Sequence, residues 1–203
     1  MNIPIYTFSE AKKHIKEADI LLFRAGDFPS AGWWITGLSG GIHSHVGLAS
    51  LSSGDITIIE QKEFKGGREV ILKSQIKDST IDVYRISPKI TVRKDGKWVE
   101  KTFNEDIAHN VTSRARKITG EAYNWTNIWK IYKSYLPVYR MIFREKNGED
   151  KVSKAKICSQ LVSYSFREEY VDLVPNLRDE KTKPNDIACS AIAFPVFSIR
   201  DKA

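Results

Sequence analysis

The hydrophobic residues of this chain fall mostly into short runs separated by polar and glycine-rich breaks, a pattern that favours strands over long helices. The run DILLFR at 19–24 predicts a buried strand, and the residues before it, 9–18, predict a short helix. Further strand signals, bounded by turn residues, occur at 44–50, 55–60, 69–73 and 81–86. Because these runs follow one another with short breaks, we expect an antiparallel sheet.

Two later stretches have the spacing of helices. Asn104 is placed to cap a helix that Gly120 ends, with acidic residues in its first turn. A second helix is predicted to begin near Cys158, because apolar and small residues recur after it at helical spacing. The 203 residues contain no internal repeat or linker, so we expect a single α+β domain, 1–203, with a mostly antiparallel sheet packed against helices.

Two stretches interrupt this pattern and are expected to be peripheral insertions. Asp95-Gly96 supplies the residues of a tight turn, so the stretch near 90–101 predicts a hairpin. The stretch near 126–153 is irregular and partly helical in character, and it belongs to a longer segment, 120–156, that is rich in Tyr and Trp.

A third irregular stretch, 25–41, combines glycine and proline with two adjacent tryptophans, Trp33 and Trp34, and predicts a long surface loop. The loop leads directly into the 44–50 strand, so its end must lie near the first residues of that strand. Exposed tryptophans suit stacking on a substrate, a lipid interface or closure over a cleft, and burial in the protein's own core is an equally good interpretation. We treat both tryptophans as candidate substrate-binding residues.

Composition narrows the class of protein. The 32 Lys and Arg against 25 Asp and Glu give a net charge of +7, which favours acidic partners such as anionic lipid, cell-wall polymer or nucleic acid. The basic runs also carry acids, so we expect solvated loops and no specific nucleic-acid partner. The first twenty residues lack a secretory pattern, and we therefore expect cytoplasmic synthesis without Sec export, with non-Sec delivery to the envelope or another cell left open. Cys158 and Cys189 are then expected to be reduced thiols.

The segment GGIHSHVGLAS, 40–50, places His43 and His45 at the head of a strand. On a regular strand the two side chains point to the same face. If 51–54 forms the turn, His45 lies directly opposite Glu60, whose carboxylate would hydrogen-bond one imidazole nitrogen and fix the orientation of the ring. His43 has no such partner.

Three interpretations of the histidines remain open. Either histidine is a satisfied structural residue, or His43 and His45 bind a metal together with Glu60 or Cys158, or one histidine is the base for a cysteine nucleophile. Cys158 suits the last interpretation because the first turn of a helix favours thiolate, although a buried core cysteine has equal weight. Cys189 has no such setting and is more typical of a structural cysteine.

Four segments resemble the NlpC superfamily of papain-like cysteine peptidases. They are ADILLF at 18–23, HVGLA at 45–49, YNW at 123–125 and CSQLV at 158–162. Their order is a rotation of the order typical of the superfamily, which is what circular permutation produces. The arrangement is similar to the permuted YaeF/YiiX-like branch, which is related to lecithin:retinol acyltransferase-like enzymes.

The resemblance implies a permuted papain-like fold with Cys158 as nucleophile, His45 as base and Glu60 as the residue that orients His45. Tyr123 matches a family tyrosine near the site, and a core tyrosine is an equally good interpretation.

The chain departs from the family pattern at two positions. Ile157 stands where the family has Asp, and Gln160 stands where it has Gly, which bears on access of substrate to the sulfur.

The function that the resemblance implies is amide hydrolysis by a cysteine peptidase or amidase, with peptidoglycan stem peptides as a candidate substrate. Alternatives are a lipid acyl hydrolase or acyltransferase of the lecithin:retinol acyltransferase-like type, and a non-catalytic binding module. No metal or organic cofactor is expected. The partners expected are a peptide or cell-wall substrate, or an acylated lipid with peripheral membrane contact, and the sequence does not indicate an oligomeric state.

Overall fold

The structure is a computed structural model that describes residues 3–25, 41–51, 54–63, 65–76, 79–94, 97–121 and 157–201. Within these residues the strands form a seven-stranded sheet of order β1-β9-β6-β2-β3-β4-β5 and a separate β7-β8 hairpin. The strands are β1 Ile5–Tyr6, β2 Ile20–Arg24, β3 His43–Ser50, β4 Thr57–Lys62, β5 Gly66–Ile71, β6 Ile81–Ile86, β7 Lys89–Lys94, β8 Lys97–Thr102 and β9 Ala193–Ile199. The helices are α1 Phe8–Ala11, α3 Glu105–Lys117, α6 Cys158–Arg167 and α7 Pro184–Ala188, with 3-10 turns at Leu72–Gln75 and Asp179–Lys181.

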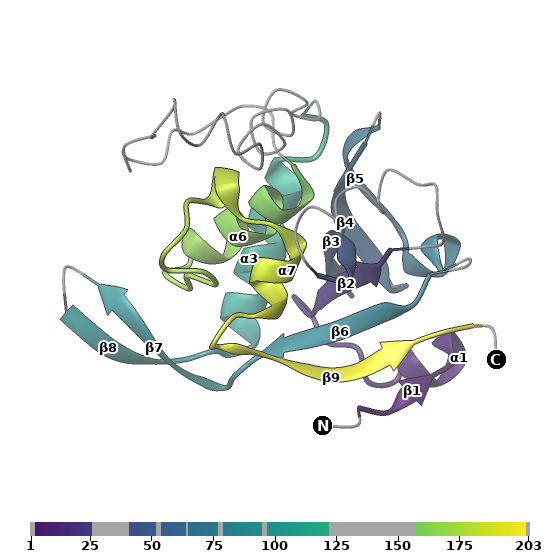
Figure 1. Cartoon of the computed structure of the whole chain (residues 1–203), viewed down its shortest axis with the longest axis horizontal. Helices are drawn as coiled ribbons and strands as arrows, with labels where there is room; N and C mark the ends of the chain where they lie inside the picture. Colours follow the sequence, from purple (N-terminus) through teal and green to yellow (C-terminus); the bar gives the residue numbers. More distant parts are fainter. Residues whose placement is uncertain are drawn as a thin grey trace.

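The large sheet is antiparallel at every pairing except the short parallel contact of β1 with β9 (Figure 1). The expected α+β class with a mostly antiparallel sheet is therefore confirmed. β9 contains Pro195, which cannot donate a ladder hydrogen bond, and a register shift opposite Val83 and Tyr84 accommodates it.

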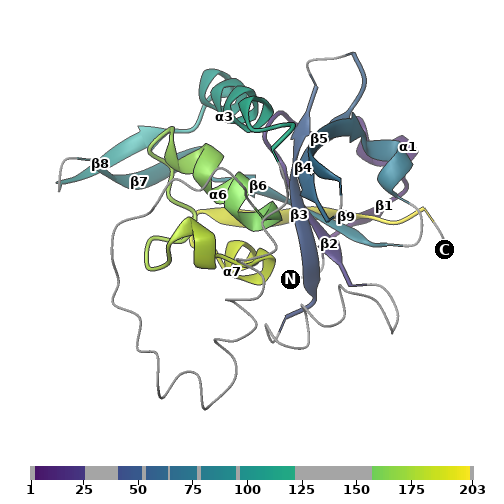
Figure 2. The same cartoon turned by 90° about the horizontal axis from the view of Figure 1, so that it is seen from above.

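The sheet separates two hydrophobic cores. On one side Leu22 and Leu48 pack in a cluster with Cys158 and Phe166 of α6. On the other side lies a second cluster that includes Leu21, the α1 segment and the Leu72–Gln75 turn. Figure 2 shows α3, α6 and α7 together on one side of β3, and α1 on the other. Since successive residues of a strand face opposite sides, β2 and β3 contribute to both cores.

Helices α3 and α6 begin close to where the sequence predicts. The Asn104 side chain accepts the Ile107 N–H at 3.0 Å, as an N-cap should, and α3 runs from Glu105 to Lys117. Gly120 follows with φ +90, a value that glycine adopts at low cost. Helix α6 begins at Cys158, and nearly all of its residues are buried.

The helix predicted over 9–18 is wrong in extent, because α1 ends at Ala11. Thr7 and Glu10 form a capping box that starts it. Past Ala11 the chain turns, since the Asp19 carboxylate accepts the Lys16 N–H at 2.8 Å and Ala18 has φ 60. Local side-chain hydrogen bonds of this kind compete with a continuing helix.

The register predicted between β3 and β4 is wrong by two residues. The ladder pairs Ser50 with Thr57 and Gly47 with Glu60, so the connection is longer than 51–54. His45 is therefore a diagonal neighbour of Glu60 and not its direct partner. A shift of two residues keeps every side chain on its face, and the two side chains stay on the same side of the sheet.

The remaining predictions concern peripheral segments. A hairpin, β7 and β8, lies in the stretch predicted to form one, and its strands project from the body of the sheet (Figure 1). The stretch 126–153 and nearly all of the 25–41 loop lie outside the described residues. None of the helices in the described ranges is long and apolar enough to span a bilayer.

Candidate active site

His45 and Glu60 form the centre of the candidate site. His45 lies near the start of β3, and its Nε2 is 2.6 Å from Oε2 of Glu60 on β4. The Glu60 side chain is 1% exposed and that of His45 is 13% exposed. The ring of Phe23 on the adjacent strand also packs against the imidazole, with 5.3 Å between ring centroids. The imidazole is thereby held in one orientation.

Cys158 joins this pair from the helical side. It is the first residue of α6, and its side chain interacts with the His45 ring and raises the pKa of that ring. Because Glu60 occupies Nε2, Nδ1 is the ring nitrogen left to face the sulfur. The first turn of α6 contains no acidic residue, and unpaired N–H groups at a helix start favour a thiolate. From the sequence we predict that these three residues form one site, and in the structure they lie next to one another.

The pKa values of the pair are shifted toward the charged forms. Burial alone would lower the pKa of His45, but the charges and hydrogen bonds of Cys158 and Glu60 outweigh it and raise the pKa from 6.5 to about 9. Burial alone would raise the pKa of Glu60, yet its interactions with His45 and Arg68 and the positive charge of Lys62 lower it from 4.5 to about 2. These two shifts favour an imidazolium at His45 beside an ionised Glu60 carboxylate at neutral pH.

Arg68 is a site residue that the sequence reasoning missed. It lies directly opposite Glu60 on β5, and its Nε donates to Oε1 of Glu60 at 2.9 Å. The guanidinium also donates to Oε1 of Gln75 at 3.0 Å. Each carboxylate oxygen of Glu60 thus has its own partner. Arg68 could have been predicted from the sequence if β4 and β5 had been paired as a hairpin, because this pairing places Arg68 opposite Glu60.

His43 is directed to a different carboxylate. Its Nε2 is 2.8 Å from Oδ2 of Asp82 on β6, and both side chains are 4% exposed. Asp82 also accepts hydrogen bonds from Arg24 and Ser198. Burial would raise the pKa of Asp82, but these three partners lower it well below its usual range. His43 therefore has a charged partner that the sequence did not predict.

The expectation that His43 and His45 share a face is wrong because β3 contains a bulge. The ladder pairs Phe23 with His45 and Arg24 with His43, so Ser44 is an extra residue. This arrangement also separates the ligands of the metal interpretation. Among the residues that the structure describes, no group of three His, Cys, Asp or Glu side chains could hold a metal ion.

The other residues singled out from the sequence have mixed outcomes. Trp33, Trp34 and Tyr123 lie outside the described residues. Cys189 is a free thiol at the end of α7 and is exposed, so the structural role suggested for it has no support from core packing. Gln160, which replaces the family glycine, is 4% exposed.

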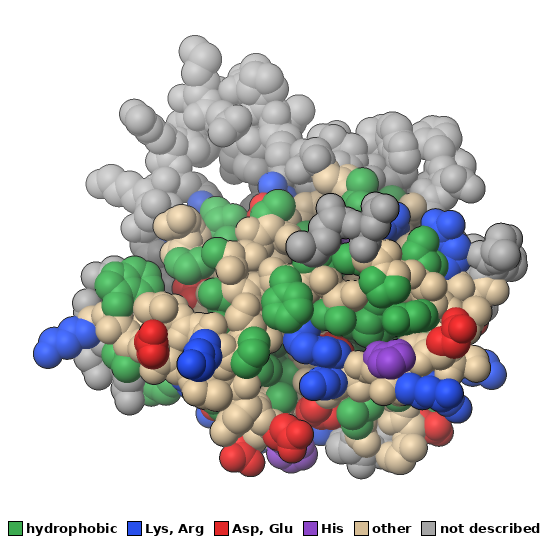
Figure 3. Space-filling view, turned by 90° about the horizontal axis from the view of Figure 1, so that it is seen from below, with side chains coloured by type: hydrophobic (Ala, Val, Ile, Leu, Met, Phe, Trp, Pro, Cys, Tyr) green, Lys and Arg blue, Asp and Glu red, His purple; other side chains and the backbone are tan. Residues whose placement is uncertain are grey.

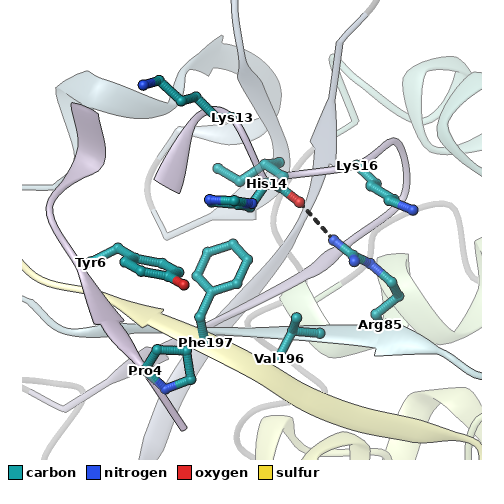
Figure 4. Close-up of a pocket in the computed structure, with 9 residues that line it drawn as sticks. Pro4, Tyr6, Lys13, His14, Lys16, Arg85, Val196 and Phe197 are labelled. Carbon is teal, nitrogen blue, oxygen red and sulfur yellow. Dashed lines mark hydrogen bonds between the residues drawn. The ribbon is translucent and has the colours of Figure 1, made fainter. Parts of the chain in front are cut away.

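A surface cavity of about 260 Å³ lies apart from this site. Its lining residues are Pro4, Tyr6, Lys13, His14, Ile15, Lys16, Arg85, Val196 and Phe197. In Figure 4 the Lys13 and Lys16 side chains extend away from the rings of the cavity, and Arg85 donates to the His14 carbonyl oxygen. Arg85 also pairs with Asp19. The polar groups do not converge there, so the cavity lacks the character of a catalytic site.

On the face in Figure 3, Lys and Arg side chains are mixed with acidic and hydrophobic ones. The net charge of +7 is not gathered there into one basic patch.

Comparison with known proteins supports the fold. No protein-family model matches the chain, and no curated protein matches it in sequence. Among solved structures it is similar to the crystal structure of metalloprotein yiiX from Escherichia coli O157:H7, DUF1105, with a TM-score of 0.51 and 15% identity. The match covers 89% of this chain and 96% of that chain. At this identity the likeness concerns the fold alone, and on that ground the chain has a YiiX-like fold.

Proposed function

We propose that the chain is a cysteine hydrolase of the permuted papain-like type that cleaves an amide bond with Cys158, His45 and Glu60. The observation that carries the proposal is the position of the His45 ring, which is bonded to Glu60 through Nε2 and interacts with the Cys158 side chain at the start of α6. A nucleophile, a base and a residue that orients the base are what covalent catalysis by cysteine requires. The order of the four segments and the YiiX-like fold support the permuted form.

The reaction would use each group at a stated atom. His45 holds the proton taken from the Cys158 thiol, and Sγ of Cys158 forms a bond to the substrate carbonyl carbon. The C–N bond then breaks, the amine leaves with the proton from His45, and a thioester remains on Cys158. Water, deprotonated by His45, attacks the thioester and releases the carboxylate and the thiol. Glu60 stays ionised and stabilises the imidazolium throughout.

The backbone of α6 offers a site for the developing negative charge. The first N–H groups of a helix have no partner within the helix, and Cys158 is the first residue of α6. The Cys158 N–H is therefore the candidate donor to the oxyanion of the tetrahedral intermediate.

The test must separate the two thiols, because Cys189 is exposed and Cys158 is buried. In a Cys189→Ser background, a thiol-reactive acyl probe should label the protein, and Cys158→Ser should abolish labelling. His45→Ala should slow labelling about tenfold or more near neutral pH, because an ordinary thiol is mostly protonated there. Labelling that is as fast in His45→Ala as in the parent would contradict the proposal.

A panel of substrates is needed to identify the type of bond that is cleaved. Peptidoglycan stem peptides should release new amino groups, whereas phospholipid or acyl-ester substrates would release fatty acid. Cys158-dependent release of fatty acid without amide cleavage would favour the lipid acyl hydrolase. If the probe labels Cys158 but no substrate in the panel is turned over, the result would favour a binding module.

A further inference from the structure

At His43, the edge of β3 that faces away from β2 extends beyond the end of β4, and a side chain from α7 bonds the main chain there. The β3-β4 ladder begins at Gly47, so the first residues of β3 have no partner in β4. At this point the side-chain amide of Asn185 takes the place of a strand. Its Oδ1 accepts the His43 N–H at 3.0 Å, and its Nδ2 donates to the His43 carbonyl oxygen at 3.0 Å. Both polar groups of one backbone residue are satisfied by one side chain.

Gly41 provides the space for this clamp. A Cβ at position 41 would lie 2.1 Å from Cγ of Asn185 and 2.2 Å from its Oδ1. Contacts this short do not occur between nonbonded heavy atoms, so a side chain at 41 would displace the Asn185 amide. The His43 ring adds a further anchor through Asp82 at 2.8 Å. These contacts fix the residue immediately before the Ser44 bulge.

The same segment is tied to the start of α6. Asn185 lies on α7, which packs against β3 through the fully buried Ile187. Just before α7, the Thr182 carbonyl oxygen accepts the Ser159 hydroxyl at 2.5 Å. Ser159 follows Cys158, and His43 precedes the bulge that leads to His45. The stretch from Thr182 to Asn185 therefore connects Ser159, next to Cys158, with His43, close to His45.

We infer that Asn185 is a positioning residue, which holds the bulged start of β3 against α7 so that the His45 ring faces Cys158. The inference rests on the proposed function, because the alignment matters chemically only if Cys158 and His45 act as a pair. The side-chain amide of Asn185 bonds the His43 backbone, and Asn185 acts on the site through that backbone. Without the clamp the bulge can relax, and a small rotation of the strand is enough to break a hydrogen bond.

The experiment uses the full chain in the Cys189→Ser background with three variants. Asn185→Ala removes the clamp, and Gly41→Ala displaces it without removing any polar group. Asn104→Ala is the control, because it removes the cap of α3 away from the site and lowers stability by another route. Two readouts are taken: the pKa of the His45 ring by NMR, assigned by its loss in His45→Ala, and the rate of Cys158 alkylation at about pH 6.

The inference expects Asn185→Ala and Gly41→Ala to move the His45 pKa from about 9 toward 6.5 and to slow alkylation about tenfold or more. Asn185→Asp keeps the acceptor and loses the donor, so it should fall between the parent and Asn185→Ala. Asn104→Ala should change the alkylation rate by less than about twofold.

Two results would overturn the inference. One is a parent-like pKa and rate in both Asn185→Ala and Gly41→Ala. The other is an equal loss in Asn104→Ala, which would mean that general destabilisation is the cause. If alkylation is slow in His45→Ala and fast in Asn185→Ala, the inference fails and the proposed function stands. If alkylation is already fast in His45→Ala, the proposed function fails.

Discussion

At the scale of single residues, the two oxygens of the Glu60 carboxylate serve different partners. Oε2 meets Nε2 of His45 at 2.6 Å, and Oε1 accepts from Arg68. The carboxylate has little freedom to rotate, because each end is held by a charge-assisted hydrogen bond. The orientation of the imidazole therefore depends on β5 as well as on β4, although only β4 was considered from the sequence.

Removing the charge of Glu60 should lower the pKa of His45. In Glu60→Gln the amide still reaches the ring but no longer attracts a proton onto it, so we expect the pKa to fall from about 9 by about one unit or more. NMR titration of the His45 ring measures the change. Glu105→Gln, at an exposed position in the first turn of α3, is the matched control and should leave the titration unchanged. An unshifted His45 in Glu60→Gln would refute the role assigned to Glu60.

Gly47 is required for close packing beside the site. A Cβ there would lie 2.6 Å from Cδ1 of Ile58 and 3.0 Å from the Ile59 carbonyl oxygen. Gly47→Ala should therefore destabilise the protein by about 1–3 kcal/mol, as overpacked cores do. Urea unfolding measures the change, and a variant as stable as the parent would mean that Ile58 moves aside without cost.

At the scale of elements, local sequence signals were sufficient to predict where helices begin, whereas the sequence did not predict how the strands pair. The start of α3 at Asn104 and the start of α6 at Cys158 could be predicted because caps and periodicity are local. The register of β3 on β4 could not, since it depends on a connection whose length the sequence left ambiguous. The bulge at Ser44 was also missed, because it is set by Asn185, which is distant in the sequence.

The candidate site was more predictable than the pairing that holds it. His45, Glu60 and Cys158 were found together because a two-residue error of register does not change the face of a side chain. Arg68 and Asp82 were missed since each belongs to a strand whose partner was not assigned. Trp33, Trp34 and Tyr123 stay predictions, because they lie outside the described residues.

Just beyond the end of α6, one residue has a strained backbone conformation. Tyr170 has φ 59 and is 59% exposed, and the Val171 N–H closes the helix on the Phe166 carbonyl oxygen at 3.0 Å. Tyr170→Gly relieves about 1 kcal/mol of left-handed strain. It also loses the contact of the ring with Lys101, at 5.6 Å from its centroid, worth about 0.5–1 kcal/mol.

Tyr170→Ala separates these two effects, because it loses the ring and keeps the Cβ. We expect the glycine variant to be about 1 kcal/mol more stable than the alanine variant in urea unfolding. Equal stability of the two would show that the backbone at 170 is not strained.

At the scale of the whole molecule, the charged pair at the site links stability to pH. The pKa of His45 in the fold, about 9, exceeds its ordinary 6.5, so its contribution is complete below pH 6.5 and is lost as pH rises through 9. The pKa of Glu60, about 2, is below its ordinary 4.5, so its contribution is present above pH 4.5 and is lost as pH falls toward 2. The pair therefore stabilises the fold most between pH 4.5 and 6.5.

The free energy of unfolding of the parent, measured in urea between pH 4.5 and 9, should decline from pH 6.5 to 9. His45→Ala should decline less steeply, because the group that loses its proton is absent. The difference between the two proteins isolates the site from the other titrating residues. Parallel curves for parent and variant would contradict the raised pKa of His45.

The contact between Gly41 and Asn185 has an evolutionary consequence. A side chain at 41 and an asparagine at 185 compete for one volume, with 2.1 Å between the atoms concerned. A lineage that loses Asn185 first can later accept alanine or serine at 41, whereas the reverse order passes through a clashing intermediate. Descendants of a common ancestor should therefore change these two positions in a fixed order, so that a substituted 41 occurs only beside a residue smaller than asparagine at 185.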